Sequence, residues 1–304
     1  MNYIVTTDHL TKVYGSKRAL DGVTFDVQEG EILGLVGKNG AGKTTLIRVL
    51  TDVVRPTSGS YTLFGEETPE GLCHARKEVA AMVERPAFFE YMNAFQNLYN
   101  RALLMNVDGN ISKYCYDLLD FVGLSEVAHT KKKVRDFSLG MKQRLGIAIA
   151  LMGDPKLLIL DEPTNGLDPE GIIQIRELLL KLNREKNITI IIASHILSEL
   201  SKLATRYCFI KEGKVIKFLT SEEIEHAGSK RLHIEATDNA KALQILAENG
   251  FKAIENGPQI EVSGYEESAP VIMLLAQNGI AITKMKEDAA ELEDFYLKLM
   301  EEKQ

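Results

Sequence analysis

One glycine-rich stretch is the most informative part of the chain, Gly37-Lys38-Asn39-Gly40-Ala41-Gly42-Lys43-Thr44. It fits the pattern G-x-x-x-x-G-K-[ST] and lies between the apolar run 32–36, typical of a buried strand, and residues 45–50, which can open a helix. In that context the glycines let backbone N–H groups converge on phosphate oxygens, and the start of the helix adds partial positive charge. The stretch therefore predicts a nucleoside triphosphate site, and a glycine-rich turn that matches by accident is the alternative.

The side chains at the end of this stretch suit the chemistry of a triphosphate. Lys43 is expected to reach the β- and γ-phosphates, and the Thr44 hydroxyl is expected to take a Mg²⁺ coordination position. The residues expected to contact the nucleotide are Gly37, Lys38, Asn39, Gly40, Ala41, Gly42, Lys43, Thr44 and Thr45.

Two adjacent carboxylates follow a second apolar run, residues 157–160. Asp161 would hold Mg²⁺, usually through water, and Glu162 would orient or deprotonate the attacking water, because phosphoryl transfer needs positioning and charge stabilisation. A solvated strand end is the alternative. His195 follows the apolar run 188–193, where the carboxyl edge of a sheet would meet a bound nucleotide. A lone histidine is more often structural, so the spacing alone leaves both interpretations of His195 open.

The composition is that of a soluble globular protein with a sizeable core, and 304 residues allow one large domain or two ordinary ones. The net charge of -7 argues against nucleic acid as the main partner. No window has the roughly 18 uninterrupted apolar residues that a spanning helix needs, and the N-terminus lacks the order of a secretory signal. Cys73, Cys115 and Cys208 are far apart and indicate neither a zinc site nor a disulfide framework. We therefore expect a cytoplasmic protein.

Periodicity divides the first 220 residues into sheet and helix. The alternation over 3–27 predicts two antiparallel strands, and short strands are expected at 59–65 and 79–83. Residues 94–152 have a helical pattern without a strand signal, which predicts a separate helical lobe of about 86–153. The runs 157–160 and 188–192 are typical of parallel strands, and a helix near Pro169 would join them as a βαβ unit. A hairpin around Gly213 pairs 207–210 with 215–218.

The composition turns polar around residues 220–230, where we expect a boundary between domains 1–222 and 229–304. Beyond it, two apolar helices each end at a glycine suited to a left-handed cap, Gly250 and Gly279. A strand is expected after each helix, and residues 231–235 and 260–262 are expected to form two more strands. The order of elements then becomes β-α-β-β-α-β, which predicts a small ferredoxin-like sheet. Residues 291–300 would form a last helix.

Four motifs together resemble the ATPase domain of ABC transporters: the stretch 37–44, Ser138-Leu139-Gly140-Met141-Lys142-Gln143-Arg144, residues 161–168, and His195. Their order and spacing match over roughly residues 3–220. The resemblance implies an α/β P-loop NTPase fold with a RecA-like core, an antiparallel β subdomain and a helical lobe. The C-terminal α+β ferredoxin-like domain would be an addition to it.

The resemblance also implies a homodimer in which two domains pack head to tail around ATP. Each ATP would lie between one glycine-rich stretch and segment 138–143 of the other protomer, where Ser138 and the backbone of Gly140 would contact the γ-phosphate. By the same resemblance Tyr14 would stack on adenine, His195 would act as the γ-phosphate switch, and Asp168 would couple the two sites.

The sequence departs from the family pattern at three places. Lys38 stands where relatives often have proline. In segment 138–143, Leu139 replaces a glycine and Met141 replaces a glutamine, which removes flexibility and one side-chain amide. Glu84 replaces the usual glutamine of a loop that touches the metal and the membrane partner, and a carboxylate is the better Mg²⁺ ligand. With residues 86–89 after it, this loop resembles the bacitracin-export and lantibiotic-immunity branch. Phe88, Phe89 and Phe95 would either belong to the core or line a groove for the permease.

These observations predict an ATP-hydrolysing subunit that dimerises on ATP and drives a separate transmembrane permease from the inner face of the membrane. The cargo would be a peptide antibiotic or another amphipathic compound. Two alternatives remain at this point. One is a soluble ABC protein that acts on ribosomes or DNA, although a single cassette and a net negative charge do not favour it. The other is a clamp that binds ATP without hydrolysis, which the presence of Glu162 argues against.

Overall fold

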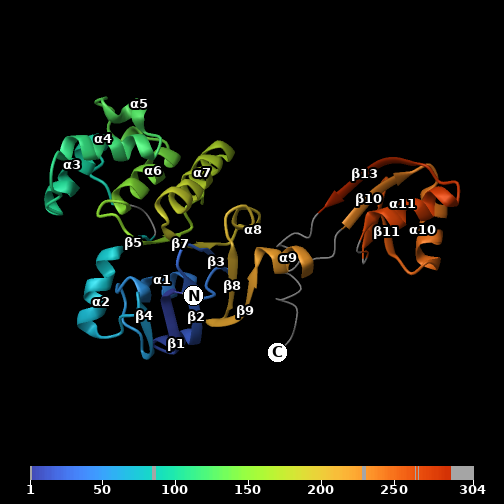
Figure 1. Ribbon diagram of the computed structural model, residues 1–304, viewed down its shortest axis with the longest axis horizontal. Helices are drawn as coiled ribbons and strands as arrows, with labels where there is room; N and C mark the ends of the chain where they lie inside the picture. Colours follow the sequence, from blue (N-terminus) through green and yellow to red (C-terminus); the bar gives the residue numbers. More distant parts are fainter. Residues whose placement is uncertain (1, 84–86, 228–230, 264, 266, 289–304) are drawn as a thin grey trace. The chain divides into compact units, whose positions relative to one another are not determined.

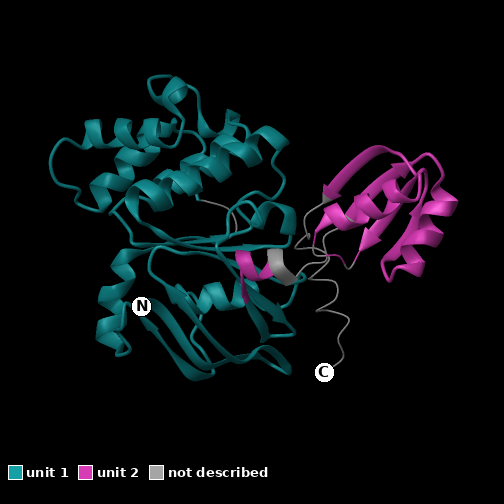
Figure 2. Cartoon of the chain, turned by 45° about the vertical axis from the view of Figure 1, so that its right-hand side comes forward, with its two compact units in different colours: residues 1–218 teal, residues 219–304 magenta. Residues whose placement is uncertain are grey.

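The computed structural model describes residues 2–83, 87–227, 231–263, 265 and 267–288. The chain divides into two compact units, residues 1–218 and 219–304, shown in different colours in Figure 2. The linker expected between residues 222 and 229 coincides largely with a helix, α9 (Ser221–Ala227), which this division places in the second unit.

A six-stranded sheet forms the centre of the first unit, in the order β5-β6-β7-β3-β8-β9. The first five strands of that order pair in parallel, and β9 completes the hairpin expected around Gly213. All residues of the strands in the middle of the sheet are buried, because helices or a second sheet cover both faces. The bounds are β3 (Ile32–Val36), β5 (Val79–Met82), β6 (Leu157–Asp161), β7 (Thr189–Ser194), β8 (Arg206–Lys211) and β9 (Lys214–Thr220).

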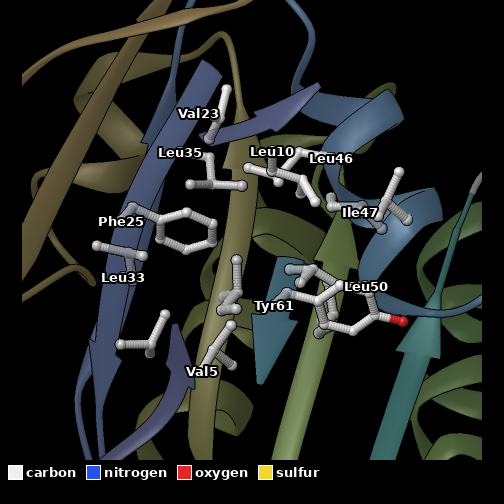
Figure 3. Close-up of a cluster of buried hydrophobic side chains, with 14 of the residues drawn as sticks. Val5, Leu10, Val23, Phe25, Leu33, Leu35, Leu46, Ile47, Leu50 and Tyr61 are labelled. Carbon is white, nitrogen blue, oxygen red and sulfur yellow. The ribbon is translucent and has the colours of Figure 1, made fainter. Parts of the chain in front are cut away.

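An antiparallel sheet of order β2-β1-β4 packs against the parallel sheet, with helix α1 (Lys43–Leu50) in their shared core. Its strands are β1 (Tyr3–Tyr14), β2 (Lys17–Gln28) and β4 (Ser58–Leu63). Figure 3 shows the side chains of this core, among them Val5, Leu10, Val23, Phe25, Leu33, Leu35, Leu46, Ile47, Leu50 and Tyr61. This burial holds α1 firmly, so the position of its first residue is fixed.

Helices make up the lobe that was expected between β5 and β6, and Figure 1 shows it on the opposite side of the parallel sheet from β1, β2 and β4. A capping box opens its first helix: Asn93 accepts from the Gln96 N–H (2.8 Å), and Gln96 accepts from the Asn93 N–H (3.1 Å). The elements are α3 (Ala94–Leu104), α4 (Ile111–Phe121), α5 (Ser125–Ala128), η2 (Val134–Asp136) and α6 (Leu139–Ala150).

Three further helices and a short turn connect the strands of the first unit: α2 (Pro69–Ala75), η1 (Arg76–Glu78), α7 (Pro169–Lys186) and α8 (Leu197–Leu200). The three phenylalanines for which two roles were open differ in their surroundings. The Phe95 ring stacks on Tyr116 at 4.7 Å between centroids, so Phe95 contributes to packing inside the lobe. Phe88 is half-buried, whereas 48% of Phe89 is exposed.

The second unit has the expected β-α-β-β-α-β order, and its sheet, β11-β12-β10-β13, is antiparallel throughout. This order defines the ferredoxin-like arrangement, which confirms the prediction. The bounds are β10 (Arg231–Ala236), α10 (Asn239–Glu248), β11 (Lys252–Asn256), β12 (Gln259–Ser263), α11 (Ser268–Gln277) and β13 (Ile282–Asp288). The helix expected at 291–300 lies outside the described residues. Within the described ranges, every helix is too short or too polar to cross a membrane.

Candidate functional site

The glycine-rich loop between β3 and α1 follows a path that side chains would block. A Cβ atom on Gly37 would lie 2.4 Å from the carbonyl oxygen of Ile210 in β8. Gly42 has a φ of +116° and would place its Cβ 2.7 Å from the carbonyl oxygen of Ala19. These positions need glycine because backbone from two other strands passes so close to the loop.

Lys43 is the first residue of α1, and only 6% of it is exposed. Its ammonium group donates hydrogen bonds to the carbonyl oxygens of Gly37 (2.6 Å) and Lys38 (3.4 Å), so the side chain lies back across the loop. Burial lowers the pKa of Lys43, and the nearby carboxylates of Glu162 and Asp161 act in the opposite direction. The loop thus encloses a cation whose hydrogen bonds are made by backbone carbonyl groups.

A cavity of about 590 Å³ opens beside this loop. It brings together the glycine-rich loop, the end of β6, the hairpin of β1 and β2, and the start of α6, segments that are far apart in the sequence. The residues that line it are Lys17, Ala19, Asn39, Gly40, Gly42, Lys43, Thr44, Thr45, Leu139, Gln143, Asp161, Glu162, Asn165 and Gly166. Eight of these residues were predicted from the sequence, seven as nucleotide or metal contacts and Glu162 as a catalytic residue: Asn39, Gly40, Gly42, Lys43, Thr44, Thr45, Asp161 and Glu162.

The oxygen atoms around this cavity fit a magnesium ion. Strand β6 ends at Asp161, which is 7% exposed, and its Oδ1 atom is buried without a hydrogen-bond partner among the described residues. A buried carboxylate oxygen without a partner is unfavourable, and a bound cation would satisfy it. Thr44 lines the same cavity and offers a hydroxyl oxygen. Glu84, the third metal ligand expected from the sequence, lies outside the described residues.

Glu162 and His195 meet although 33 positions separate them in the sequence. The Nδ1 atom of His195 lies 2.8 Å from the Oε2 atom of Glu162, so a protonated Nδ1 donates a hydrogen bond to the carboxylate. Glu162 has a φ of +51°, a conformation that costs on the order of 1–3 kcal/mol and is concentrated at functional sites. Its N–H donates to the carbonyl oxygen of Ala193 at 2.9 Å, which anchors it to the end of β7. His195, whose role the spacing left open, therefore has the Glu162 carboxylate as a partner.

Other predicted site residues lie outside the lining of this cavity. Tyr14 is 43% exposed, and the Lys12 ammonium lies 5.0 Å from its ring centroid. Ser138 and Asp168 both cap helices: the Ser138 hydroxyl accepts from the Met141 N–H (3.2 Å), and Asp168 accepts from the Gly171 N–H (3.0 Å). Gly37, Lys38, Ala41 and Gly140 also lie outside the lining, the first three in the loop itself and Gly140 in the first turn of α6.

Sequence reasoning did not assign a site role to several lining residues, of which Lys17 is the most informative. Lys17 pairs with Tyr14 across the tight β1–β2 turn, so the two side chains share one face of the hairpin. Its neighbour Arg18 is occupied by an ion pair with Asp21 at 2.6 Å. The sequence did contain a signal for this role, because Lys17 follows Tyr14, the residue expected to stack on adenine, by three positions.

We expect Gly37→Ala to weaken ATP binding at least about tenfold, a loss of about 1.4 kcal/mol in binding free energy, because the new Cβ would displace the loop from Ile210. Isothermal titration with ATP measures the affinity, and circular dichroism verifies that the protein is folded. A folded variant with unchanged affinity would contradict the proposed path of the loop.

We expect Lys17→Ala to weaken ATP binding about fivefold, because an exposed charge pair contributes about 1 kcal/mol or less. The loss should shrink as salt is added, since salt screens exposed charges. The control is Arg18→Ala, because the Arg18 guanidinium group pairs with Asp21. Equal losses in the two variants would show that Lys17 has no specific contact with the nucleotide.

Comparison with known proteins agrees with this geometry. The family model described as ABC transporter matches residues 20–165. The bacitracin transport ATP-binding protein BcrA of Bacillus licheniformis is 38% identical over an alignment of 305 positions, which covers 99% of this chain and 98% of that protein. The lantibiotic transport ATP-binding protein SrtF of Streptococcus pyogenes is 41% identical over 224 residues, 74% of this chain and 92% of that protein.

A solved structure of cbiO1 from Clostridium perfringens, described as part of the ABC transporter complex cbiONQ, superposes with a TM-score of 0.67 and 27% identity. The match covers 81% of this chain and 96% of that one. The fold, the cavity and relatives that match along nearly the whole chain all indicate the same family. The chain belongs to the ATP-binding proteins of the ABC transporter family, whose members hydrolyse ATP to drive transport.

Proposed function

We propose that this chain is the ATP-hydrolysing subunit of a transporter whose permease is a separate membrane protein. One observation carries the proposal: the buried cation of Lys43, the unpartnered oxygen of Asp161 and the Glu162–His195 pair surround or adjoin one cavity. A regulatory clamp would need the binding groups alone, whereas this site also has a carboxylate held by a histidine.

The residues of the site divide between binding and chemistry. The N–H groups of the loop and the Lys43 ammonium bind the triphosphate, and Thr44 and Asp161 would hold Mg²⁺. The bound ion would supply positive charge against the phosphate oxygens. Glu162 orients a water molecule for attack on the γ-phosphorus and accepts its proton, while the bond to the leaving phosphate oxygen breaks. His195 holds the Glu162 carboxylate by the bond from Nδ1.

Assembly as an ATP-bound homodimer accounts for the exposed start of α6. Ser138 is exposed, and Leu139 beside it is 45% exposed, at the end of a helix that carries partial positive charge. In a head-to-tail dimer this end would meet the γ-phosphate of the ATP held by the other protomer, with Ser138 and the backbone of Gly140 as donors. Tyr14 stacks on adenine and Asp168 couples the two sites in this arrangement.

The similarity to the bacitracin and lantibiotic transport proteins supports a peptide antibiotic or a similar amphipathic compound as cargo. The chain would then act at the inner face of the membrane through its permease. Lys131, Lys132 and Lys133 are exposed on the helical lobe, where they would meet either solvent or lipid headgroups. Glu84 is proposed as a further Mg²⁺ contact, and domains 1–222 and 229–304 as the functional division.

We expect Glu162→Gln to lower phosphate release by about 100-fold or more, because the amide cannot accept the proton of the attacking water. In the presence of ATP the variant should then form a stable dimer, which light scattering detects as a doubled molar mass. The control is Glu170→Gln, an exposed residue in the first turn of α7 that should leave turnover unchanged. A Glu162→Gln protein that stays monomeric with saturating ATP would contradict the dimeric site.

We expect the tagged chain to purify with a membrane permease from detergent-solubilised membranes. Vesicles that contain both proteins should then accumulate a cyclic peptide antibiotic when ATP is added outside, and Glu162→Gln should abolish this uptake. Copurification with ribosomes instead, with no membrane protein present, would favour a role outside transport.

A further inference from the structure

The start of α6 contacts the segment that follows the catalytic carboxylate in the same chain. Leu139, the first residue of α6, lies so that its Cδ2 atom is 3.3 Å from the position of a Cβ atom on Gly166. One residue further, the Cδ2 atom of Leu167 lies 3.8 Å from the position of a Cβ atom on Gly140. The start of the helical lobe therefore lies beside the segment from Gly166 to Leu167, and each side contributes a leucine side chain.

This segment is tied to Glu162 by short-range hydrogen bonds. The Asn165 N–H donates to the carbonyl oxygen of Glu162 at 3.2 Å, and the Leu167 N–H donates to that of Thr164 at 3.2 Å. Thr164 is 5% exposed, and Glu162 is anchored in turn to β7. A chain segment with two turn hydrogen bonds and a buried residue in the middle moves largely as one piece, so a shift at Gly166 reaches Glu162.

We infer that Leu139 is a positioning residue for ATP hydrolysis: by packing on Gly166 it holds the segment that carries Glu162, and so links the helical lobe to the catalytic carboxylate within one protomer. The inference rests on the proposed role of Glu162. Leu139 lines the cavity together with Asn165 and Gly166, but it acts through Gly166 rather than on the nucleotide.

The exposure of Leu139 makes this role separable from stability. Because 45% of the residue is exposed, truncation removes little buried surface, and the thermal midpoint should change by no more than a few degrees. A displaced Glu162 would change the rate of the chemical step strongly, since small misplacements of reacting groups are costly. A merely structural residue would show the opposite pattern, a lower midpoint and an unchanged rate in the fraction that is folded.

The first test measures phosphate release by Leu139→Ala, Leu139→Gly and Leu139→Met. We expect kcat to fall about tenfold or more in the alanine and glycine variants, with KM for ATP within about twofold of the parent value. The methionine variant should recover most of kcat, because its flexible side chain can still reach Gly166. Ile173→Ala, an exposed apolar residue of α7 that does not line the cavity, is the matched control.

The second test is a double-mutant cycle with Gly166→Ala. The φ of +76° at Gly166 strains an alanine in any background, whereas the 3.3 Å approach of Leu139 exists only when leucine is present. We expect Gly166→Ala to lower kcat less in the Leu139→Ala background than in the parent, a non-additivity that reports the contact itself.

Three results would overturn the inference: additive effects in the cycle, an unchanged or raised kcat in Leu139→Gly, or a loss that appears in KM for ATP. Glu162→Gln in the same assay separates this failure from that of the proposed function. If the parent hydrolyses ATP and Glu162→Gln does not, such results remove only the role of Leu139. If the parent shows no turnover, or Glu162→Gln equals it, both proposals fail.

Discussion

Helix α1 lies in a core shared by the parallel and antiparallel sheets, and the side chains of Leu46, Ile47 and Leu50 are completely buried in it. A helix held this tightly cannot slide or rotate, so its first residue, Lys43, has one position. The loop before it must then pass close to β8 and to the hairpin of β1 and β2, which only glycine permits at residues 37 and 42. The rest of the site is arranged around this fixed loop.

Charge is distributed across the cavity in a way that matches a magnesium triphosphate. The buried Lys43 ammonium lies near the carboxylates of Glu162 and of Asp161, the last residue of β6, and Asp161 retains an oxygen with no partner among the described residues. Burying such groups without a ligand is unfavourable, because their interactions with water are lost and only partly replaced. The packing of the two sheets therefore compensates for the cost of burying these groups, and a bound nucleotide with its cation would give the Asp161 oxygen a partner.

The helical lobe and the segment that follows Glu162 are joined by side chains that the parallel sheet does not provide. Leu139 and Gly140 belong to the first turn of α6, whereas Gly166 and Leu167 precede α7, and the first turns of these two helices lie close together. If the lobe moved, these apolar groups would transmit the movement to the segment that follows Glu162. Movement of the lobe and hydrolysis would then be coupled within each protomer, in addition to any coupling across a dimer.

Contiguous patterns allowed the sequence to predict the P-loop, the βαβ unit and the β-α-β-β-α-β order of the second unit, because local periodicity and glycine positions are set by neighbouring residues. The residues of the glycine-rich loop, Asp161 and Glu162 were candidates for the same reason. The tertiary structure alone decided which distant groups meet: His195 with Glu162, Lys17 with the cavity, and Leu139 with Gly166. Spacing along a chain does not record these contacts, since they depend on the order of strands in the sheet and on how the helices pack against it.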